Sequence, residues 1–177
     1  MIILGIDPGS VVTGWGVVET RGANLRGIDA GALKLGRGAL EERLVKLFDG
    51  LSGVIEEHTP DQVAVEDIFF AKYPNAALKL GHARGVALLV AARAGLSVAA
   101  YPPAVVKRTV AGRGRADKTQ VAQLVAAILG WQTKKTHYPI DATDALAIAI
   151  THARAASALG AGLPTKGRRA RKSRKAR

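Results

Sequence analysis

Four acidic residues of this chain could together support metal-dependent chemistry on a phosphodiester. Asp7 follows the short apolar run Ile2–Ile6, and Glu66 ends another apolar run. Asp141 and Asp144 lie three residues apart in a third segment. Hydrolysis by two Mg²⁺-like ions needs three or four converging carboxylates, because these hard cations prefer oxygen ligands. The sequence therefore contains a candidate catalytic metal centre made of these four acids.

Each of these acids also has a purely structural interpretation. The sequence DPG that starts at Asp7 is a common turn, since Asp bonds nearby backbone and Gly accepts a positive φ. Glu66 is compatible with a solvated strand end. Asp141 could be a helix N-cap, with Asp144 favoured near the positive end of the same helix. The residue types alone leave the metal centre and the structural roles both open.

Few other residues could take part in such chemistry. His137 and Tyr138 shortly precede Asp141 and could supply a base or a ligand, although a loop histidine without a partner is more often simply solvated. The chain has no cysteine, which excludes disulfides, thiolate zinc sites and a cysteine nucleophile. Catalysis at this site would therefore depend mainly on carboxylates.

The first part of the chain predicts a sheet that brings Asp7 and Glu66 together. Apolar runs bounded by turn residues predict strands at Ile2–Ile6, Val11–Glu19, Asn24–Leu35 and Gln62–Glu66. The first three should form an antiparallel meander. Leu and Ile recur at helical spacing over Leu40–Ile55, which predicts an amphipathic helix that ends before Pro60. After this crossover the fourth strand should run parallel to the first, so that both carboxyl ends open into one crevice.

The rest of the chain predicts alternating helices and one more strand. We expect a helix from Pro74 to about Ala94, a strand around Leu96–Tyr101, a short helix from Pro103, a helix capped by Asp117 that reaches about Leu129, and a helix from Asp141 to about Leu159. These elements indicate a single α/β domain over residues 1–159. Residues 160–177 combine Gly, Pro and Ser with eight basic residues, so a basic tail that is disordered until bound is expected.

No membrane span or secretory leader is expected. The apolar stretch 85–106 contains one charge, Arg93, and is interrupted by Gly95 and two prolines. A charge at the centre of a membrane helix costs about 2.5 to 3.5 kcal/mol, and proline breaks the helix. The N-terminal apolar run has no basic residues before it and stops at Asp7. These features predict a cytoplasmic protein.

Charge is divided unevenly along the chain, whose formal net charge is +12. Residues 1–67 hold 6 basic and 11 acidic residues, whereas residues 68–140 hold 11 basic residues and a single acid, Asp117. Clustered carboxylates inside a basic field fit a metal-dependent enzyme acting on nucleic acid. The candidate phosphate contacts are Lys72, Lys79, Arg84, Lys107, Arg108, Arg113, Arg115 and Lys118.

Aromatic and small residues suggest two further contacts. Phe69 and Phe70 follow the strand that ends at Glu66, and an exposed ring there could stack on an unpaired base, although both rings could instead be core. The helix after Pro74 carries alanines and glycines on more than one face. Such a helix permits close approach of another backbone, either inside the fold or across a two-fold axis.

Three motifs in order resemble one known family. The motifs are GIDPGS at 5–10 with TGWG at 13–16, VEDIFFAKYPNAALKLGHARGV at 65–86, and DATDALAIAITH at 141–152. They are similar to the RuvC Holliday junction resolvases over residues 1 to about 155. This resemblance implies a ribonuclease H-like fold with a central five-stranded mixed β-sheet flanked by α-helices. It also implies an endonuclease that resolves four-way DNA junctions by paired symmetric nicks in homologous recombination and repair.

The resemblance carries specific roles and partners. It implies that Asp7, Glu66, Asp141 and Asp144 bind two catalytic ions, Mg²⁺ or Mn²⁺. It places Phe69 at the junction centre and Lys107 and Lys118 near the scissile strand, and it implies a homodimer that works with the RuvA-RuvB branch-migration complex. Some members have His at the position of Asp141, the segment 131–140 is longer than in some relatives, and the basic tail lies outside the common pattern.

Two other functions remain open from the sequence. Another ribonuclease H-like nuclease would act on RNA or on simple duplexes, and a non-catalytic basic module would bind DNA without cutting it. An ATPase half of the actin or sugar-kinase type also starts with a similar strand. It would need a second lobe, for which 177 residues leave no room.

Overall fold

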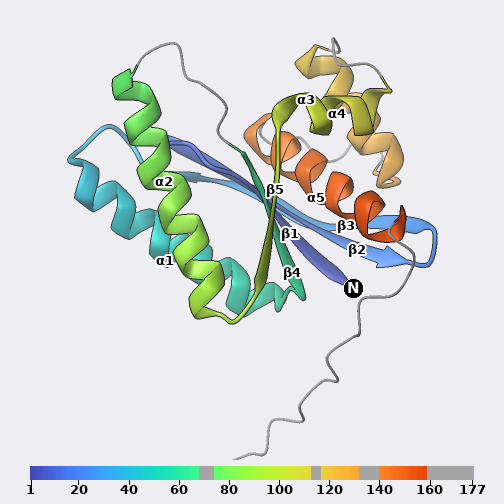
Figure 1. Cartoon of the computed structure of the whole chain (residues 1–177), viewed down its shortest axis with the longest axis horizontal. Helices are drawn as coiled ribbons and strands as arrows, with labels where there is room; N and C mark the ends of the chain where they lie inside the picture. The colour runs from blue at the N-terminus through green and yellow to red at the C-terminus, as the bar shows by residue number, and fades with distance from the viewer. Residues whose placement is uncertain (68–73, 113–116, 132–139, 159–177) are drawn as a thin grey trace, which may run out of the picture.

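A five-stranded mixed sheet forms the centre of the protein (Figure 1). The computed structural model describes residues 1–67, 74–112, 117–131 and 140–158. The strand order is β3-β2-β1-β4-β5, with bounds β1 Ile2–Asp7, β2 Val12–Arg21, β3 Asn24–Lys34, β4 Gln62–Glu66 and β5 Ser97–Tyr101. Strands β1, β2 and β3 form an antiparallel meander, whereas β4 is parallel to both β1 and β5. The predicted meander and the predicted parallel pairing of the first and fourth strands are confirmed.

Helices cover both faces of this sheet. The two on one face are α1 (Leu40–His58) and α2 (Pro74–Arg93), and the three on the other are α3 (Pro103–Ala111), α4 (Lys118–Ile128) and α5 (Ile140–Ala158) (Figure 1). The predicted elements are all found, with ends shifted by a few residues at most. No helix in the described ranges has the length and apolarity that a membrane span requires.

One boundary changes the interpretation of an acid. Helix α5 begins at Ile140, so Asp141 lies inside the first turn and the proposal that it is the N-cap is wrong. Asp117, in contrast, is the predicted cap of α4. Its carboxylate accepts a hydrogen bond from the Gln120 backbone N–H at 2.8 Å, and the Gln120 side chain accepts one from Asp117 N–H. This capping box fixes the start of α4.

Alternation along β1 divides the core into two layers. Ile3 packs into the cluster formed with α3, α4 and α5, whereas Leu4 and Ile6 pack into the cluster formed with α1 and α2. Side chains of a strand point alternately to its two faces, so a continuous apolar run is what a strand covered on both sides requires. The buried strand in turn fixes where Asp7 leaves the sheet.

Glycines on β1 and β2 allow α5 to lie directly against the sheet. A Cβ atom added to Gly5 would come within 2.1 Å of the Ala145 carbonyl oxygen, and one added to Gly14 within 1.9 Å of the Asp141 carbonyl oxygen. A Cβ at Gly16 would collide with Leu146. Only glycine permits this approach, which brings the start of α5 beside the end of β1.

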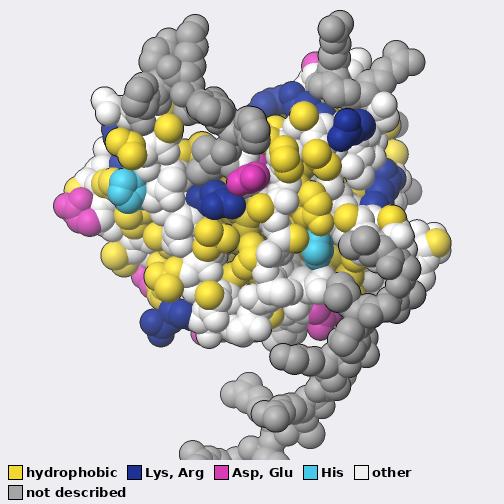
Figure 2. All heavy atoms as spheres, viewed as in Figure 1, with side chains coloured by type: hydrophobic (Ala, Val, Ile, Leu, Met, Phe, Trp, Pro, Cys, Tyr) yellow, Lys and Arg dark blue, Asp and Glu magenta, His cyan; other side chains and the backbone are white. Residues whose placement is uncertain are grey.

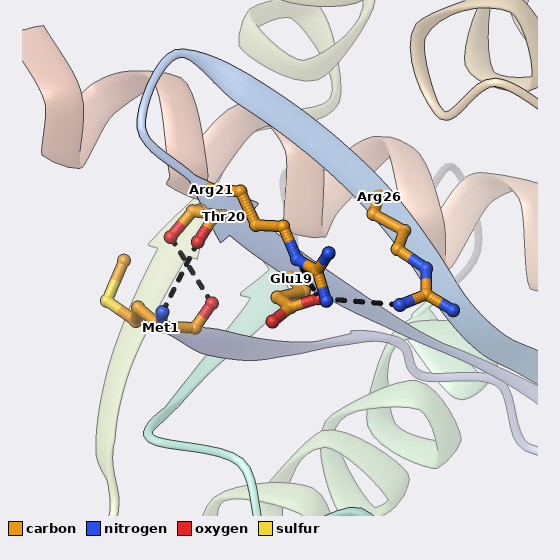
Figure 3. Close-up of polar contacts among 5 residues, drawn as sticks. All are labelled: Met1, Glu19, Thr20, Arg21 and Arg26. Carbon is orange, nitrogen blue, oxygen red and sulfur yellow. Dashed lines mark hydrogen bonds and ion pairs between the residues drawn. The ribbon is translucent and has the colours of Figure 1, made fainter.

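The opposite end of the sheet is closed by polar contacts (Figure 3). The Thr20 backbone N–H donates to the Met1 carbonyl at 2.9 Å, and the Thr20 hydroxyl donates to the same oxygen at 3.3 Å. Glu19 forms an ion pair with Arg21 at 2.8 Å and a longer one with Arg26 at 3.9 Å. These contacts involve Met1, just before β1, whereas Asp7 is the last residue of that strand. They leave the carboxyl end of the strand for the candidate site.

We expect Gly14→Ala to destabilise the protein because the new methyl group would meet helix backbone, which cannot move like a side chain. Overpacking of this kind costs roughly 1 to 3 kcal/mol or more. Gly53 is the matched control, since a Cβ there meets no atom within 4 Å and the residue lies inside α1. Gly53→Ala should stabilise by up to about 1 kcal/mol. Urea unfolding of the two variants measures the difference, and equal free energies of unfolding would contradict the close seating of α5.

Candidate active site

The carboxylates of Asp7 and Glu66 meet at the carboxyl ends of two parallel strands. Ile6 is paired with Val65, so the next residue of each strand lies at the same edge. Asp7 and Glu66 are both partly buried, and both line the same pocket. The predicted crevice between β1 and β4 is therefore present.

Helix α5 contributes the other two acids. Asp144 lines a pocket of about 250 Å³ together with Asp7 and Glu66; its other lining residues are Pro103, Val106, Lys107, Lys118, Val121 and Ala147. Asp141 lies one turn earlier and is not part of that lining, although its charge still acts on Asp7. Three predicted acids thus share one pocket, and the fourth stands beside it.

Crowded negative charge dominates the electrostatics of this pocket. Burial, and then the charges of Glu66, Asp144 and Asp141, raise the pKa of Asp7 to about 7, while Lys118 opposes the shift. Burial and the Asp144 charge also raise the pKa of Glu66. A carboxyl group keeps its proton when desolvation and neighbouring anions disfavour its charged form. The crowding of negative charge in this pocket therefore favours the protonated form of Asp7.

Two lysines partly balance the acids. Lys118 Nζ lies 3.1 Å from Asp144 Oδ2, and this hydrogen bond raises the pKa of Lys118. The position of Lys118 follows from the capping box, because it is the first residue of α4. Lys107, on α3, lines the same pocket and lowers the pKa of Glu66. The two lysines that the family resemblance placed near the scissile strand thus line the same pocket as the acids.

The acids fit a divalent cation. The four acids offer only carboxylate oxygens as ligand atoms. Such atoms suit hard ions such as Mg²⁺ and Mn²⁺ and not metals that prefer thiolate ligands. The raised pKa of Asp7 shows that the acids lack enough positive charge of their own. Within the described residues, no three acidic or histidine side chains are already close enough to hold one ion. Lys118 holds Asp144 instead, so metal binding would have to compete with that ion pair.

The turn after Asp7 is held by residues that the sequence did not single out for a role. The Thr13 hydroxyl donates to the Gly9 carbonyl at 2.9 Å and accepts from the Gly9 N–H at 3.1 Å. Arg43, a buried residue of α1, donates to the Ser10 carbonyl. Thr13, which closely follows the turn, was the only sequence signal for these contacts. Arg43 comes from a helix distant in the sequence and leaves no local pattern.

The predicted DNA contacts are only partly described. Lys79 on α2 and Lys107 and Arg108 on α3 are exposed, whereas Arg84 on α2 is engaged with Asp67. Figure 2 shows Lys and Arg side chains gathered over α3 and α4. The following predicted residues lie outside the described ranges: Phe69, Phe70, Lys72, Arg113, Arg115, His137 and Tyr138.

Comparison with known proteins gives the family. A family model described as "Crossover junction endodeoxyribonuclease RuvC" matches residues 3–152. The chain belongs to this family. A protein of Sorangium cellulosum named crossover junction endodeoxyribonuclease RuvC is 48% identical over 175 residues, 95% of this chain and 96% of its own length. A protein of the same name from Halorhodospira halophila is 52% identical over 157 residues, 88% of this chain and 92% of its own length.

Solved structures agree with this assignment. T. thermophilus RuvC in complex with a Holliday junction substrate matches with a TM-score of 0.81 and 39% identity, over 88% of this chain and 94% of that chain. The ribonuclease H-like fold predicted from the sequence is therefore confirmed, as is the predicted membership of the RuvC family. As RuvC-family enzymes are crossover junction endodeoxyribonucleases, the chain is a nuclease.

The charge on Asp7 should make the metal-free protein less stable as the pH rises. Between about pH 4 and pH 7 the unfolded chain has lost the Asp7 proton and the folded protein has kept it, so stability falls with pH across this window. Asp7→Asn removes the penalty. At pH 8 in EDTA, this variant should exceed wild type in free energy of unfolding by at most about 4 kcal/mol.

Thermal and urea unfolding at pH 8 and pH 4 measure this effect. Glu56→Gln is the control, because Glu56 is an exposed acid on α1 and does not line the pocket. Added Mg²⁺ should stabilise wild type and leave Asp7→Asn much less affected, because the ion binds only a folded site. If the free energy of unfolding of Asp7→Asn changed with pH in the same way as that of wild type and of Glu56→Gln, the charge crowding assigned to Asp7 would be contradicted.

Proposed function

We propose that this RuvC-family chain resolves four-way (Holliday) DNA junctions by paired symmetric nicks, in homologous recombination and DNA repair. The observation that carries the proposal is the meeting of Asp7, Glu66 and Asp144, from three separate elements, in one pocket with Lys107 and Lys118. Carboxylates for a metal and lysines for a phosphate are the groups that phosphodiester hydrolysis requires. A relative of the same family has been solved with a Holliday junction substrate.

The four acids are proposed as the catalytic metal ligands. Asp7, Glu66 and Asp144 would hold Mg²⁺ or Mn²⁺ in the pocket, and Asp141 would assist from its rim. Two bound ions supply an activated water and stabilise the leaving oxygen. The chain itself orients these ligands: β1 and β4 fix two of them at adjacent strand ends, and α5 brings the others across.

Lys118 has two successive roles in this proposal. Without metal it neutralises Asp144 at 3.1 Å. If cations satisfied the acids, its ammonium group would be free to contact the scissile phosphate. Lys107 faces the same pocket from α3 and would bind the phosphate from that side. A lysine acts on a phosphate as a point charge and needs no rigid geometry, which suits such an exchange.

The wider DNA surface is proposed to follow the basic side chains around the pocket. Lys79, Lys107, Arg108 and Lys118 are the described contacts. The sequence adds the residues outside the described ranges, namely Phe69, Lys72, Arg113, Arg115 and the basic tail 160–177. Most of these contacts would be with phosphates and so position the junction without reading its sequence. The aromatic ring of Phe69 would stack at the junction centre.

A homodimer is proposed to place two active sites on one junction. The outer face of α2 and the adjoining part of α1 form a shallow groove of about 500 Å³, lined by Leu44, Ala77, Leu78, Gly81, His82, Gly85, Val86 and Leu89. Leu78 is 63% exposed and Leu89 52% exposed. Apolar side chains beside glycines suit close contact between two copies of one helix. Cytoplasmic RuvA-RuvB complexes would deliver the junction to this dimer.

We expect Glu66→Gln and Asp144→Asn to abolish metal-dependent cutting while junction binding is retained, because the acids hold metal and the lysines hold phosphate. Loss of a metal ligand should lower the single-turnover rate by at least about 100-fold, the scale on which even outer partners of metal sites act. Glu56→Gln, in an exposed position on α1, is the control. Binding is measured by gel shift without metal, and cutting is measured over a series of Mg²⁺ and Mn²⁺ concentrations.

The same assay separates the alternatives when four-way junctions, linear duplexes and RNA–DNA hybrids are compared side by side. The proposal requires selective cutting of the junction, at symmetric positions in two strands. Equal or faster cutting of duplexes or hybrids would favour the other ribonuclease H-like nuclease. Binding without cutting at any metal concentration would favour the non-catalytic basic module.

A further inference from the structure

Asp67, the residue after Glu66, is held from two sides. Its backbone N–H donates to the Tyr101 carbonyl at 2.9 Å, which extends the β4–β5 pairing one residue beyond Glu66. Its carboxylate Oδ1 accepts a hydrogen bond from Arg84 Nη2 at 3.1 Å. The backbone contact fixes Asp67 to β5, and the side-chain contact fixes it to α2. The end of β4, where Glu66 enters the pocket, is therefore braced between a strand and a helix.

Arg84 is not placed like a free phosphate ligand. Its side chain is only 23% exposed, and its Nε atom is buried without a hydrogen-bond partner among the described residues. A guanidinium removed from water depends strongly on the carboxylate that remains to it. Lys79, on the same helix, is exposed and has no ion pair within the described part of the chain. The two residues looked alike in the sequence and differ in the structure.

We infer that Arg84 is a positioning residue that acts through Asp67 to hold Glu66 in the metal pocket, and that it is not a phosphate ligand. The inference rests on the proposed nuclease function. Residues that orient a metal ligand typically change metal affinity or activity by about 10- to 100-fold when replaced.

The brace also connects two proposed surfaces. Gly81 and Gly85, on either side of Arg84 in the sequence, line the apolar groove proposed for dimer contact. Arg84 projects from the same stretch of α2 to the residue beside Glu66. A change in the position of α2 would therefore reach the metal pocket through one ion pair. The position of α2, the helix that forms the proposed dimer surface, would therefore influence the metal pocket.

The test compares Asp67→Asn, Arg84→Met and Arg84→Lys with the matched control Lys79→Met. Mn²⁺ binding is measured by titration calorimetry, and single-turnover cutting is measured over a range of metal concentrations. Asp67→Asn and Arg84→Met should weaken metal binding by about 10-fold or more. Arg84→Lys retains the charge and should lose less. Lys79→Met should bind metal like wild type.

The salt dependence of junction binding, measured without metal, should separate Lys79→Met and Arg84→Met in the opposite sense to metal binding. Each lost phosphate contact flattens the log–log salt slope by about 0.9. Lys79→Met should show this change, whereas Arg84→Met should keep the wild-type slope. Thermal melting of every variant accompanies the assays. The reversed pair, Asp67→Arg with Arg84→Asp, should recover part of the metal affinity lost in Asp67→Asn, because it restores the ion pair with exchanged charges.

A flatter salt slope for Arg84→Met would overturn the inference, as would unchanged metal affinity in both Asp67→Asn and Arg84→Met. If Arg84→Met fails to fold, Arg84→Lys and the reversed pair decide by the same two measurements. Failure of the proposed function has a separate signature: wild type would cut no junction at any metal concentration. Metal titration and salt slopes would still report on Arg84 in that case.

Discussion

The close contact between α5 and the glycine-lined face of the sheet is the constraint on which the site depends. Gly5, Gly14 and Gly16 leave no side chain between the strands and the helix; helix backbone fills the space at Gly5 and Gly14, and Leu146 fills it at Gly16. Protein interiors are densely packed, so a single added methyl group would move the whole start of α5. Because Asp141 and Asp144 lie in its first turns, this approach decides whether acids distant in sequence can reach Asp7.

The same contact creates an electrostatic cost that the protein itself does not remove. Burial of the Asp7 carboxyl and the charge of Glu66, followed by the charges of Asp144 and Asp141 that α5 brings close, raise the pKa of Asp7 to about 7. Lys118 offsets part of this charge through Asp144. The fold thus holds its acids in an arrangement that is unfavourable without cations and favourable with them. A site of this kind trades stability for metal binding, as functional sites often do.

Much of the fold could be predicted because its signals are local. The run Gln62–Glu66 was predicted with its observed ends, since Pro60 closes the helix before it and the acid marks where it leaves the core. Asp117 was correctly predicted to cap α4, because an aspartate before a helical run can accept hydrogen bonds from the free backbone N–H groups of the first turn. Parallel pairing of β1 and β4 followed from the helical crossover between them. The apolar runs of β1 and β4 and the crossover between them are therefore enough to predict that Asp7 and Glu66 lie at one edge of the sheet.

Side-chain partners could not be predicted in the same way. Lys118 with Asp144, Arg84 with Asp67, and Arg43 with the Ser10 carbonyl join residues 17 to 33 positions apart, and their contacts depend on how helices sit on the sheet. Arg84 and Lys79 carry the same charge and lie on the same helix, so both were predicted from the sequence to contact phosphate. The alternating glycines of β2 were a usable signal, since glycine inside a strand often marks close approach of another backbone.

The most direct test of the account is anomalous diffraction from crystals of the protein soaked with Mn²⁺. The account predicts a peak in the pocket at coordination distance, about 2.1 Å for an ion of the Mg²⁺ type, from carboxylate oxygens of Asp7 and Glu66. Asp144 should join the ligands, and Lys118 Nζ should have left it. An ion bound elsewhere, or a pocket without a peak in which Lys118 still holds Asp144, would contradict the account.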